Sequence, residues 1–553
     1  MSRILVIGGY GGFGARLSRR LLAGGHEVLV AGRSMEKAVA FCAGLEGAEP
    51  IQADRAHGIG MAMARHRPDL VIDAAGPFQA SGYTVPEACI AMRIPYLDLA
   101  DGRDFVTGIA ALDKAARAAG VPIIAGASSV PALSGAVVRA MTADMGRIDS
   151  VEMAISASNR ASAGASIAAA MLSYIGRSVT LWRGKRWEVA HGWQEMVREP
   201  FLMRDGSGFR RLVGIADVPD HAIVPEALPG RPSVTFRAGT ELDFQMAVLW
   251  LLSWPVRWGW LTSLLPLRRL LLPLYRMTAR LGGDRSAMHI TVRGSGIERR
   301  WTILAWNGEG PEIPTLAAEI LAGDILAGRV EAGARNAWFE LTPERFEPLF
   351  AGLAVRHETV ERALPAPLYA RAMGARFAAL PPLVRAIHEV QADGGAEGEG
   401  MVTRGANPLA GLFAAMMGMP PSGSTPLHVG FAERDGEERW TRDFGGHRFA
   451  SVLSEREGGV TERFGPLRFG FDLPSDGEGL RMVLSGWSLF RIPLPRFLAP
   501  RIAAREWQEG ERFRFEVEVT MPLIGRIVHY TGWLRPIGLE KAWPERHRAF
   551  ASP

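Results

Sequence analysis

The sequence predicts an α/β protein with a Rossmann-type doubly wound parallel sheet at the N-terminus, an α+β substrate domain, and a β-rich antiparallel domain at the C-terminus. Short apolar strands alternate with helical segments up to about residue 125, longer strands of alternating polarity follow, and short strands separated by turn glycines end the chain. With 553 residues, the chain also exceeds the size of a single hydrophobic core. We therefore expect three domains, at residues 1–125, 126–363 and 364–553.

The first domain is expected to contain a parallel sheet with right-handed crossovers, because its strands are separated by amphipathic helices. Apolar runs predict strands at 3–7, 27–31, 70–73, 95–98 and 122–125, and helical periodicity predicts helices at 15–23 and 35–43.

A glycine cluster, "IGGYGGFG", joins the first strand to the first helix and matches the pattern G-x-G-x-x-G. Glycines permit the tight turn and let backbone N–H groups approach a pyrophosphate, which also gains from the helix N-terminus. Between a strand and a helix, this pattern indicates a dinucleotide-binding loop. The candidate cofactor-binding residues of the loop are Gly8, Gly9, Gly11, Gly12, Phe13 and Gly14.

The end of the second strand favours NADP(H) over NAD(H). An NAD-binding domain usually has an acidic residue there, which binds the ribose 2′-hydroxyl. Here the strand runs into Arg33 and Ser34, with Lys37 a turn later. A guanidinium forms a bidentate contact with a 2′-phosphate, and no carboxylate is present to repel that phosphate. After the presumed third strand, Asp54 is expected either to meet the adenine or to cap a helix.

Small residues follow Asp73 at the carboxyl end of the predicted fourth strand, where ligands bind in open α/β sheets and where they leave room for a nicotinamide ring. This turn continues as "VIDAAGPFQASGYTVPEACIAMRIPYLDLADGRDF", and "AGASSVPALSGAVVRAM" follows it. With the glycine loop, these stretches resemble the saccharopine dehydrogenase-like oxidoreductases over about residues 1–350. The resemblance implies that Ala75, Gly76, Pro77 and Phe78 line the nicotinamide side of the cofactor and that Ser128, Ser129 and Val130 lie near the cleft.

Candidate proton-transfer residues follow from the same region. Asp98 and Asp101 in "YLDLADGRD" and Tyr83 after the Gly-Pro turn are the candidates, with Asp98 equally suited to a capping role. His191 is interpreted as structural rather than catalytic. None of the seven tyrosines begins the Tyr-x-x-x-Lys pattern of short-chain dehydrogenases. Because lysines are few and none is placed in the cleft region, we do not expect the protein to make or cleave saccharopine.

The later segments have a different pattern. "SVEMAISAS" and "HITVRGSGIERRWTILAW" predict half-solvated antiparallel strands, and "PTLAAEILAGDIL" predicts a helix that packs back on the first domain. After Leu364, six or so alternating strands predict a curved antiparallel sheet or partial barrel, preceded by helices at 368–378 and 409–417. "WTRDFGGHRFAS" and "IPLPRFLAP" are similar to an uncharacterised, DUF4166-like domain that is fused behind such reductases.

Two segments, 243–281 and 487–504, combine tryptophan, leucine and arginine. Prolines and arginines interrupt both, so neither contains the roughly twenty uncharged residues that span a bilayer. This composition is typical of an interfacial element at lipid headgroup depth. The alternative is that both segments are buried, one at a subunit or domain interface, as in a homodimer, and the other as a link between a strand and a helix.

Composition limits the function further. The net charge of +5 comes from scattered arginines without a dense basic run, which argues against nucleic-acid binding. Two cysteines favour a reducing cytoplasm and give neither a disulfide framework nor a metal site. We therefore expect a cytoplasmic NADP(H)-dependent oxidoreductase with a lipid-like substrate, peripheral at the inner face of the membrane. The alternative is a membrane-peripheral lipid-binding or scaffold protein whose nucleotide-binding domain is not catalytic.

Overall fold

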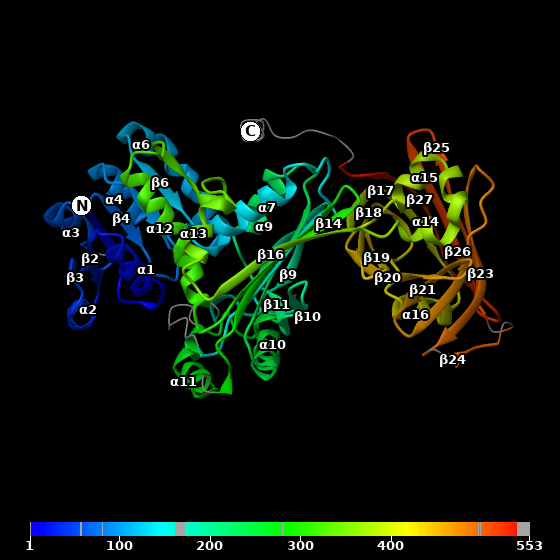
Figure 1. The fold of residues 1–553 in the computed structure, drawn as a ribbon. Coiled ribbons are helices and arrows are strands. Elements are labelled where there is room, and N and C mark those ends of the chain that lie inside the picture. The colour runs from blue at the N-terminus through cyan, green and yellow to red at the C-terminus, as the bar shows by residue number, and fades with distance from the viewer. Residues whose placement is uncertain are drawn as a thin grey trace.

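The computed structural model describes residues 2–55, 58–79, 81–160, 172–278, 281–490, 492–495, 497 and 499–538. Its first domain is built on a seven-stranded parallel sheet with the order β15-β6-β5-β4-β1-β2-β3 (Figure 1). The strands are β1 (Arg3–Ile7), β2 (Glu27–Gly32), β3 (Ala48–Gln52), β4 (Leu70–Asp73), β5 (Tyr96–Asp98), β6 (Pro122–Ala125) and β15 (Gly333–Asn336). The predicted Rossmann-type sheet is confirmed.

Helices cover both faces of this sheet, which is why its central strands are apolar and buried throughout. They are α1 (Gly12–Ala23), α2 (Met35–Cys42), α3 (Ile59–His66), α4 (Thr84–Met92), α5 (Arg103–Gly108) and α6 (Asp113–Ala119). The helix predicted from residue 15 begins at Gly12, because the last glycines of the loop already have helical geometry.

Two elements within the residue range predicted for the second domain belong to the first domain instead. Strand β15 pairs in parallel with β6, and helix α12 (Ile313–Leu326) packs on α1. Arg20 Nε lies 2.5 Å from a Glu319 carboxylate oxygen, and Arg16 lies 3.1 Å from Glu312, so two ion pairs join α12 to α1. The chain therefore crosses back to the first domain after building the second.

The second domain is a mixed seven-stranded sheet with the order β10-β11-β12-β7-β13-β14-β16, in which only the β12–β7 pair is parallel among the described strands. Its strands are β7 (Ser150–Ser156), β10 (Val197–Leu202), β11 (Gly208–Ile215), β12 (Ser233–Gly239), β13 (Ser286–Gly294), β14 (Ile297–Ala305) and β16 (Val355–Ala363). A hairpin of β8 (Ser178–Arg183) and β9 (Arg186–His191) lies beside it. The predicted α+β character is confirmed.

One hydrophobic core runs from the first domain into the second, because Ile4 and Ile72 of the first sheet belong to the same buried cluster as Met153 and Val234 of the second. The helices of the second domain are α7 (Ser134–Thr142), α9 (Asp220–Ala227), α10 (Asp243–Arg257), α11 (Arg268–Thr278) and α13 (Glu347–Phe350). Helices α10 and α11 project from its lower edge (Figure 1).

The third domain is a closed antiparallel barrel rather than the predicted partial one. Ten strands pair in chain order, the first with the last, and β22 also pairs with β23, which leaves no open edge. They are β17 (Asp393–Arg404), β18 (Gly423–Arg434), β19 (Glu437–Phe444), β20 (His447–Arg456), β21 (Gly459–Phe464), β22 (Leu467–Asp472), β23 (Gly479–Leu489), β25 (Arg501–Glu509), β26 (Arg512–Met521) and β27 (Gly525–Pro536), with the short β24 (Ile492–Pro493) beside β23.

Helices close both ends of this barrel. Helices α14 (Leu368–Met373) and α15 (Pro382–His388) lie at its upper end, and α16 (Pro408–Met416) lies at its lower end (Figure 1). The helices predicted at 368–378 and 409–417 are confirmed, the first as α14 followed by a 3-10 turn at Gly374–Ala379. In the described part of the chain, no helix is long and apolar enough to cross a bilayer.

Candidate functional site

The glycine loop lies at the carboxyl end of β1, where its residues have no room for side chains. A Cβ on Gly14 would lie 2.1 Å from the Gly8 carbonyl oxygen, and a Cβ on Gly9 would lie 2.9 Å from the Val6 carbonyl oxygen. Gly8 has a φ of +75°, which strains other residues. No side chain caps α1 and no acidic residue lies in its first turn. The N–H groups there suit an anion such as a pyrophosphate.

Tyr10 fixes this loop against the end of β2. The Ser34 N–H donates to the Tyr10 hydroxyl at 2.9 Å, and the tyrosine ring covers Gly32 so closely that a Cβ there would lie 2.4 Å from it. The Ser34 hydroxyl caps α2 by accepting from the Lys37 N–H. Sequence reasoning predicted Ser34 as a cofactor contact but missed Tyr10 as its support.

Arg33 and Lys37 are exposed beside the glycine loop, and among the described residues the Arg33 guanidinium has no hydrogen bond or ion pair. Two free cations at the end of β2 fit the 2′-phosphate of NADP(H). Asp54 follows β3 and forms an isolated bridge with Gly58, so it lies on the same edge of the sheet. Its predicted contact with the adenine stays a prediction.

An ion pair supports the turn that follows β4. The Asp73 side chain is fully buried, and its carboxylate lies 2.7 Å from Arg55 Nε. The Arg55 guanidinium stacks on the Phe78 ring at 4.3 Å and donates to the Ala75 carbonyl. Burial raises the pKa of Asp73 to about 6, against the opposing effect of Arg55. Arg55 therefore holds the turn predicted to face the nicotinamide, a role that only the fold reveals.

Asp98 is also fully buried and organises the backbone rather than facing the cleft. Its Oδ1 accepts the N–H groups of Ala100, at 2.9 Å, and Gly126, at 2.7 Å. Burial raises its pKa to about 7, although these two bonds oppose the shift. Asp98 thus ties the loop after β5 to the loop after β6, and its catalytic role stays a prediction that this geometry does not favour.

Asp101 is exposed shortly after the end of β5, beside the predicted cleft between the first two domains. Its side chain is reached by solvent and accepts a hydrogen bond from Gln79 Nε2 at 3.1 Å. The surrounding protein raises the pKa of the Asp101 carboxyl, first by desolvation and also through the charge of Asp217. The pKa of Tyr174 is raised as well, by burial and then by Asp101 and Asp217. The charges of Asp101 and Asp217 therefore act on Tyr174 across the boundary between the first two domains.

Arg103 joins the two domains beside this cleft. It donates to the Thr180 carbonyl at 2.8 Å, forms an ion pair with Asp217 and lies 2.9 Å from His221 Nδ1. His221 Nε2 accepts the Phe236 N–H, and burial lowers the pKa of His221 to about 4, which keeps the ring neutral. No local pattern indicated this cluster, because Arg103 and His221 are 118 residues apart in the chain.

The remaining predicted residues have structural contacts. Tyr83 donates its hydroxyl to the Phe105 carbonyl at 2.9 Å, and its ring packs on Phe105 at 5.0 Å. Ser128, Ser129 and Val130 are buried at the start of the turn before α7. His191 ends β9, and burial followed by the charge of Arg257 lowers its pKa. Of the predicted catalytic residues, Asp101 alone is exposed to solvent.

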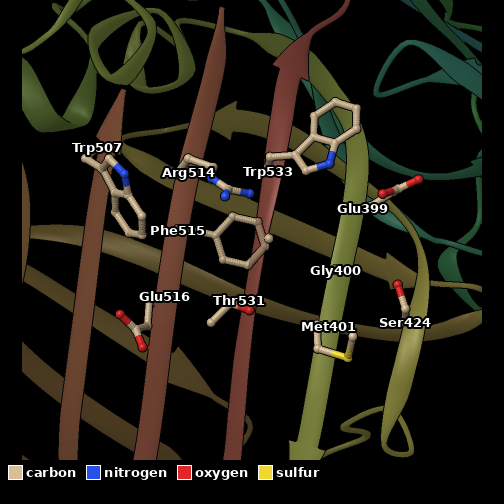
Figure 2. A pocket seen from close by; sticks show the side chains of 11 residues that line it. Glu399, Gly400, Met401, Ser424, Trp507, Arg514, Phe515, Glu516, Thr531 and Trp533 are labelled. Carbon is tan, nitrogen blue, oxygen red and sulfur yellow. The ribbon is translucent and has the colours of Figure 1, made fainter. Parts of the chain in front are cut away.

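A separate pocket of about 350 Å³ lies on the outer face of the barrel, between β25, β26, β27 and β17 (Figure 2). Trp507, Arg514 and Trp533 stand in one row across it, and Glu516 and Thr531 stand in the next. This pocket contains none of the predicted site residues, all of which lie in the first domain. In the described residues no cluster of histidine, cysteine and acidic side chains is arranged to hold a metal ion.

Comparisons with known protein families cover two parts of the chain. Residues 4–124 match the saccharopine dehydrogenase NADP binding domain, and residues 380–534 match a domain of unknown function, DUF4166. The resemblance predicted from the sequence is confirmed for these two parts. The first domain is therefore of a nicotinamide nucleotide-binding kind that occurs in oxidoreductases.

Several solved structures are similar to this chain. The apo saccharopine dehydrogenase (L-Glu forming) of Saccharomyces cerevisiae has 13% identity and a TM-score of 0.44, covering 65% of this chain and 100% of that chain. The amine dehydrogenase of Mycobacterium smegmatis has 11% identity and a TM-score of 0.37, covering 61% and 95%. Gre2 of Candida albicans, solved with NADPH, has 14% identity and a TM-score of 0.16, covering 18% and 36%. No curated protein matches the chain in sequence.

Proposed function

We propose that this protein is an NADP(H)-dependent oxidoreductase that transfers hydride to or from a lipophilic substrate. The observation that carries the proposal is the uncapped start of α1 next to the free Arg33 guanidinium at the end of β2. The start of α1 suits the pyrophosphate of a dinucleotide. The Arg33 guanidinium suits the 2′-phosphate of the same dinucleotide. When bound, NADPH supplies the hydride, so the chain itself has to place the substrate and handle one proton.

Asp101 is the proposed proton-transfer group. Reduction of a carbonyl adds a hydride to carbon and a proton to oxygen, and the reverse reaction removes both. A carboxyl group with a raised pKa holds a proton closer to neutral pH than an ordinary aspartate does. Gln79 orients this carboxyl group through its hydrogen bond.

The test is oxidation of NADPH, followed by absorbance, in the presence of extracted lipid. We expect turnover by the unchanged protein and a loss of turnover in Asp101→Asn with NADPH affinity retained. Glu46→Gln, an exposed position elsewhere on the first domain, is the control. Tight NADPH binding without turnover on any lipid fraction would support the scaffold alternative and overturn the enzymatic one.

A second proposal concerns the membrane. Trp258 and Trp260, which follow α10, and Leu270 of α11 are exposed, at 55%, 72% and 63%. No acidic residue occurs between Asp243 and Asp284. Indoles beside arginines suit the headgroup region of an anionic bilayer. The segments 243–281 and 487–504 include five positions that lie outside the described residues: 279, 280, 491, 496 and 498.

Flotation with vesicles of phosphatidylglycerol and phosphatidylcholine tests this contact. We expect the protein to float with the anionic vesicles and the double variant Trp258→Ser, Trp260→Ser to stay at the bottom. The control is Trp187→Ser, which replaces an exposed tryptophan of β9. Trp254 is more buried than Trp258 and Trp260, so it is not a suitable control. A concentration-dependent dimer that the double variant loses, without flotation, would assign the same surface to a second copy of the chain.

A further inference from the structure

Two pockets adjoin on the outer face of the barrel. The first, of about 350 Å³, lies over β17, β27, β26 and β25 (Figure 2), and the second, of about 390 Å³, lies over β26, β25 and β23. Glu516 lines both pockets, so together they form one open groove across five neighbouring strands, which we call the outer groove. Each of these strands is paired on both sides, so a ligand of the groove is recognised by side chains rather than by strand pairing.

Two tryptophans give the outer groove flat apolar surfaces. Trp507 of β25 and Trp533 of β27 are both paired with Arg514 of β26, so the three side chains form one row across the groove (Figure 2). Neighbouring strands lie about 4.8 Å apart, so the two indoles are attached about 10 Å apart. Both indoles are only half-buried. Accessible tryptophans grouped in a groove are typical of a binding surface.

Polar side chains surround the two indoles. Glu399 of β17 is paired with Trp533 and continues the row of indoles. In the next row, Glu516 lies between Arg505 of β25 and Thr531 of β27. Guanidinium groups donate hydrogen bonds, carboxylates accept them and the threonine hydroxyl does both. The groove therefore combines apolar surfaces with donors and acceptors at short range.

The charges that line the outer groove balance each other. The arginines are matched by as many glutamates: Arg481, Arg505 and Arg514 against Glu399, Glu516 and Glu518. Neighbours outside the lining add to this balance, since Arg514 Nε lies 2.7 Å from a Glu509 carboxylate oxygen and His529 Nε2 lies 3.0 Å from Glu516. A surface without an excess of either sign favours an uncharged ligand.

The indoles already have guanidinium groups over them. Arg512 lies 4.3 Å from the centroid of the Trp533 ring, and Arg505 lies 5.4 Å from that of Trp507. A cationic ligand would have to replace these cations and would be repelled by them. An anionic ligand would be repelled by the three glutamates of the groove. Both arginines are exposed, so a neutral ligand displaces them from the rings at little cost.

We propose that the outer groove binds a neutral oligosaccharide. Sugar rings have apolar C–H faces that pack on indoles, and their hydroxyl groups both donate and accept hydrogen bonds. The sugar rings lie on Trp507 and Trp533, and the hydroxyl groups bond to Arg514 and Glu516. A single sugar ring does not reach from one indole to the other, so the ligand is a chain of several sugars. This site belongs to the third domain alone and needs no dinucleotide.

Isothermal titration calorimetry with the full-length protein, without NADPH, tests the ligand class. The probes are cellohexaose and maltohexaose, which are neutral, the anionic hexamer of galacturonate, the cationic hexamer of glucosamine, and glucose. We expect one of the neutral hexamers to bind at least about tenfold more tightly than the charged hexamers and glucose. Equal binding of glucose would contradict a chain that bridges the indoles. Equal or tighter binding of a charged hexamer would overturn the neutral ligand, and failure of both neutral hexamers to bind would overturn the site.

Trp507→Ala locates the site, because it removes one of the two apolar surfaces. We expect it to weaken the binding of the neutral hexamer about tenfold. Trp187→Ala is the control, since Trp187 is an exposed tryptophan of β9 outside the outer groove, and its affinity is expected to stay unchanged. Equal affinity in both variants, each with an unchanged melting temperature, would exclude the outer groove as the site.

Arg514→Gln tests the hydrogen bonds and leaves both indoles in place. We expect it to weaken the neutral hexamer about fivefold, whereas Arg439→Gln, at an exposed position of β19 outside the groove, is expected to have no effect. The same affinity in both variants would contradict a bond to Arg514.

The competing occupant of the outer groove is a second copy of the chain. Sedimentation velocity measures this alternative. A dimer that Trp507→Ala abolishes, in a protein that binds neither neutral hexamer, would assign the groove to a self-interface and overturn the proposal. Because NADPH is absent throughout, these results stand or fall apart from the proposed oxidoreductase activity.

Discussion

Asp73 and Asp98 are paired neighbours at the carboxyl ends of β4 and β5, and both carboxyl groups are fully buried. Desolvation raises the pKa of Asp73 to about 6 and that of Asp98 to about 7. The charge of Asp73 adds to the shift at Asp98, while Arg55 is bonded to Asp73. The loops after β4 and β5 are thus held by two buried acids with raised pKa values, of which Asp73 has a cation beside it and Asp98 forms no ion pair among the described residues.

Asp98 is therefore expected to make the protein less stable as the pH rises. The pKa of Asp98 is near 7 in the folded state and ordinarily near 3.8. Between these two pH values the folded state therefore binds more protons than the unfolded state. The stability that Asp98 contributes is thus fully present below about pH 4 and is lost by about pH 7. Asp98→Asn should flatten the pH dependence of the unfolding free energy by about 2 to 4 kcal/mol over this window. Urea denaturation from pH 4 to 7.5 measures it.

The control for this measurement is Glu46→Gln, which changes an exposed carboxylate of the same domain. Its stability profile is expected to run parallel to that of the unchanged protein. If the profile of Asp98→Asn were parallel as well, Asp98 would titrate normally and the burial argument would be wrong.

Gly14→Ala is expected to prevent NADPH binding and to destabilise the protein by about 2 kcal/mol, because its methyl group would meet the Gly8 carbonyl. Gly60, in α3, has open space around it, so Gly60→Ala is expected to stabilise by about 0.5 to 1 kcal/mol through helix propensity. Fluorescence titration with NADPH and urea denaturation measure the two effects. Unchanged NADPH affinity in Gly14→Ala would remove the glycine loop from the cofactor site.

Arg33→Ser is expected to weaken NADPH binding about 10- to 100-fold and to change NADH binding little, because only NADPH carries the 2′-phosphate. Parallel titrations with both dinucleotides measure this difference. Arg65→Ser, an exposed arginine of α3, is the control for a general loss of positive charge. An equal loss for both dinucleotides in Arg33→Ser would assign Arg33 to the shared part of the cofactor and end the preference for NADP(H).

Local sequence patterns predicted the elements of this fold well. The alternation of apolar runs and helices located β1, β4 and β6 without error, because a buried parallel strand is apolar along its whole length. Strand β15 was not predicted, since its four residues, "GARN", have no apolar pattern and join the sheet only through the backbone. Closure of the barrel was also missed, because it depends on pairing between β17 and β27, which lie at opposite ends of the domain.

In the candidate site, too, local patterns did not predict contacts between segments that are distant in the chain. The glycine loop and Arg33 are local patterns, and they were found. The pair of Arg55 with Asp73 and the cluster of Arg103 with Asp217 and His221 join segments that are distant in the chain. Such contacts follow from the packing of elements, which no local pattern specifies. Asp98 and Asp101, three residues apart, were both candidates in the sequence, and only the fold shows that Asp98 bonds to the backbone whereas Asp101 bonds to Gln79.

Arg103→Met is expected to loosen the junction between the first two domains. The change removes the bonds to the Thr180 carbonyl and hydroxyl and leaves Asp217 beside the cleft without its cation. Because the Arg103 side chain is 11% exposed, we expect a loss of about 2 to 3 kcal/mol of stability. Arg117, 59% exposed in its pair with Asp113, gives the control, and Arg117→Met is expected to leave the stability nearly unchanged. NADPH affinity should persist in Arg103→Met, because the glycine loop lies in the first domain alone. Turnover should fall, because the predicted cleft needs both the first and the second domain. Unchanged stability together with unchanged turnover would show that the junction does not depend on this arginine.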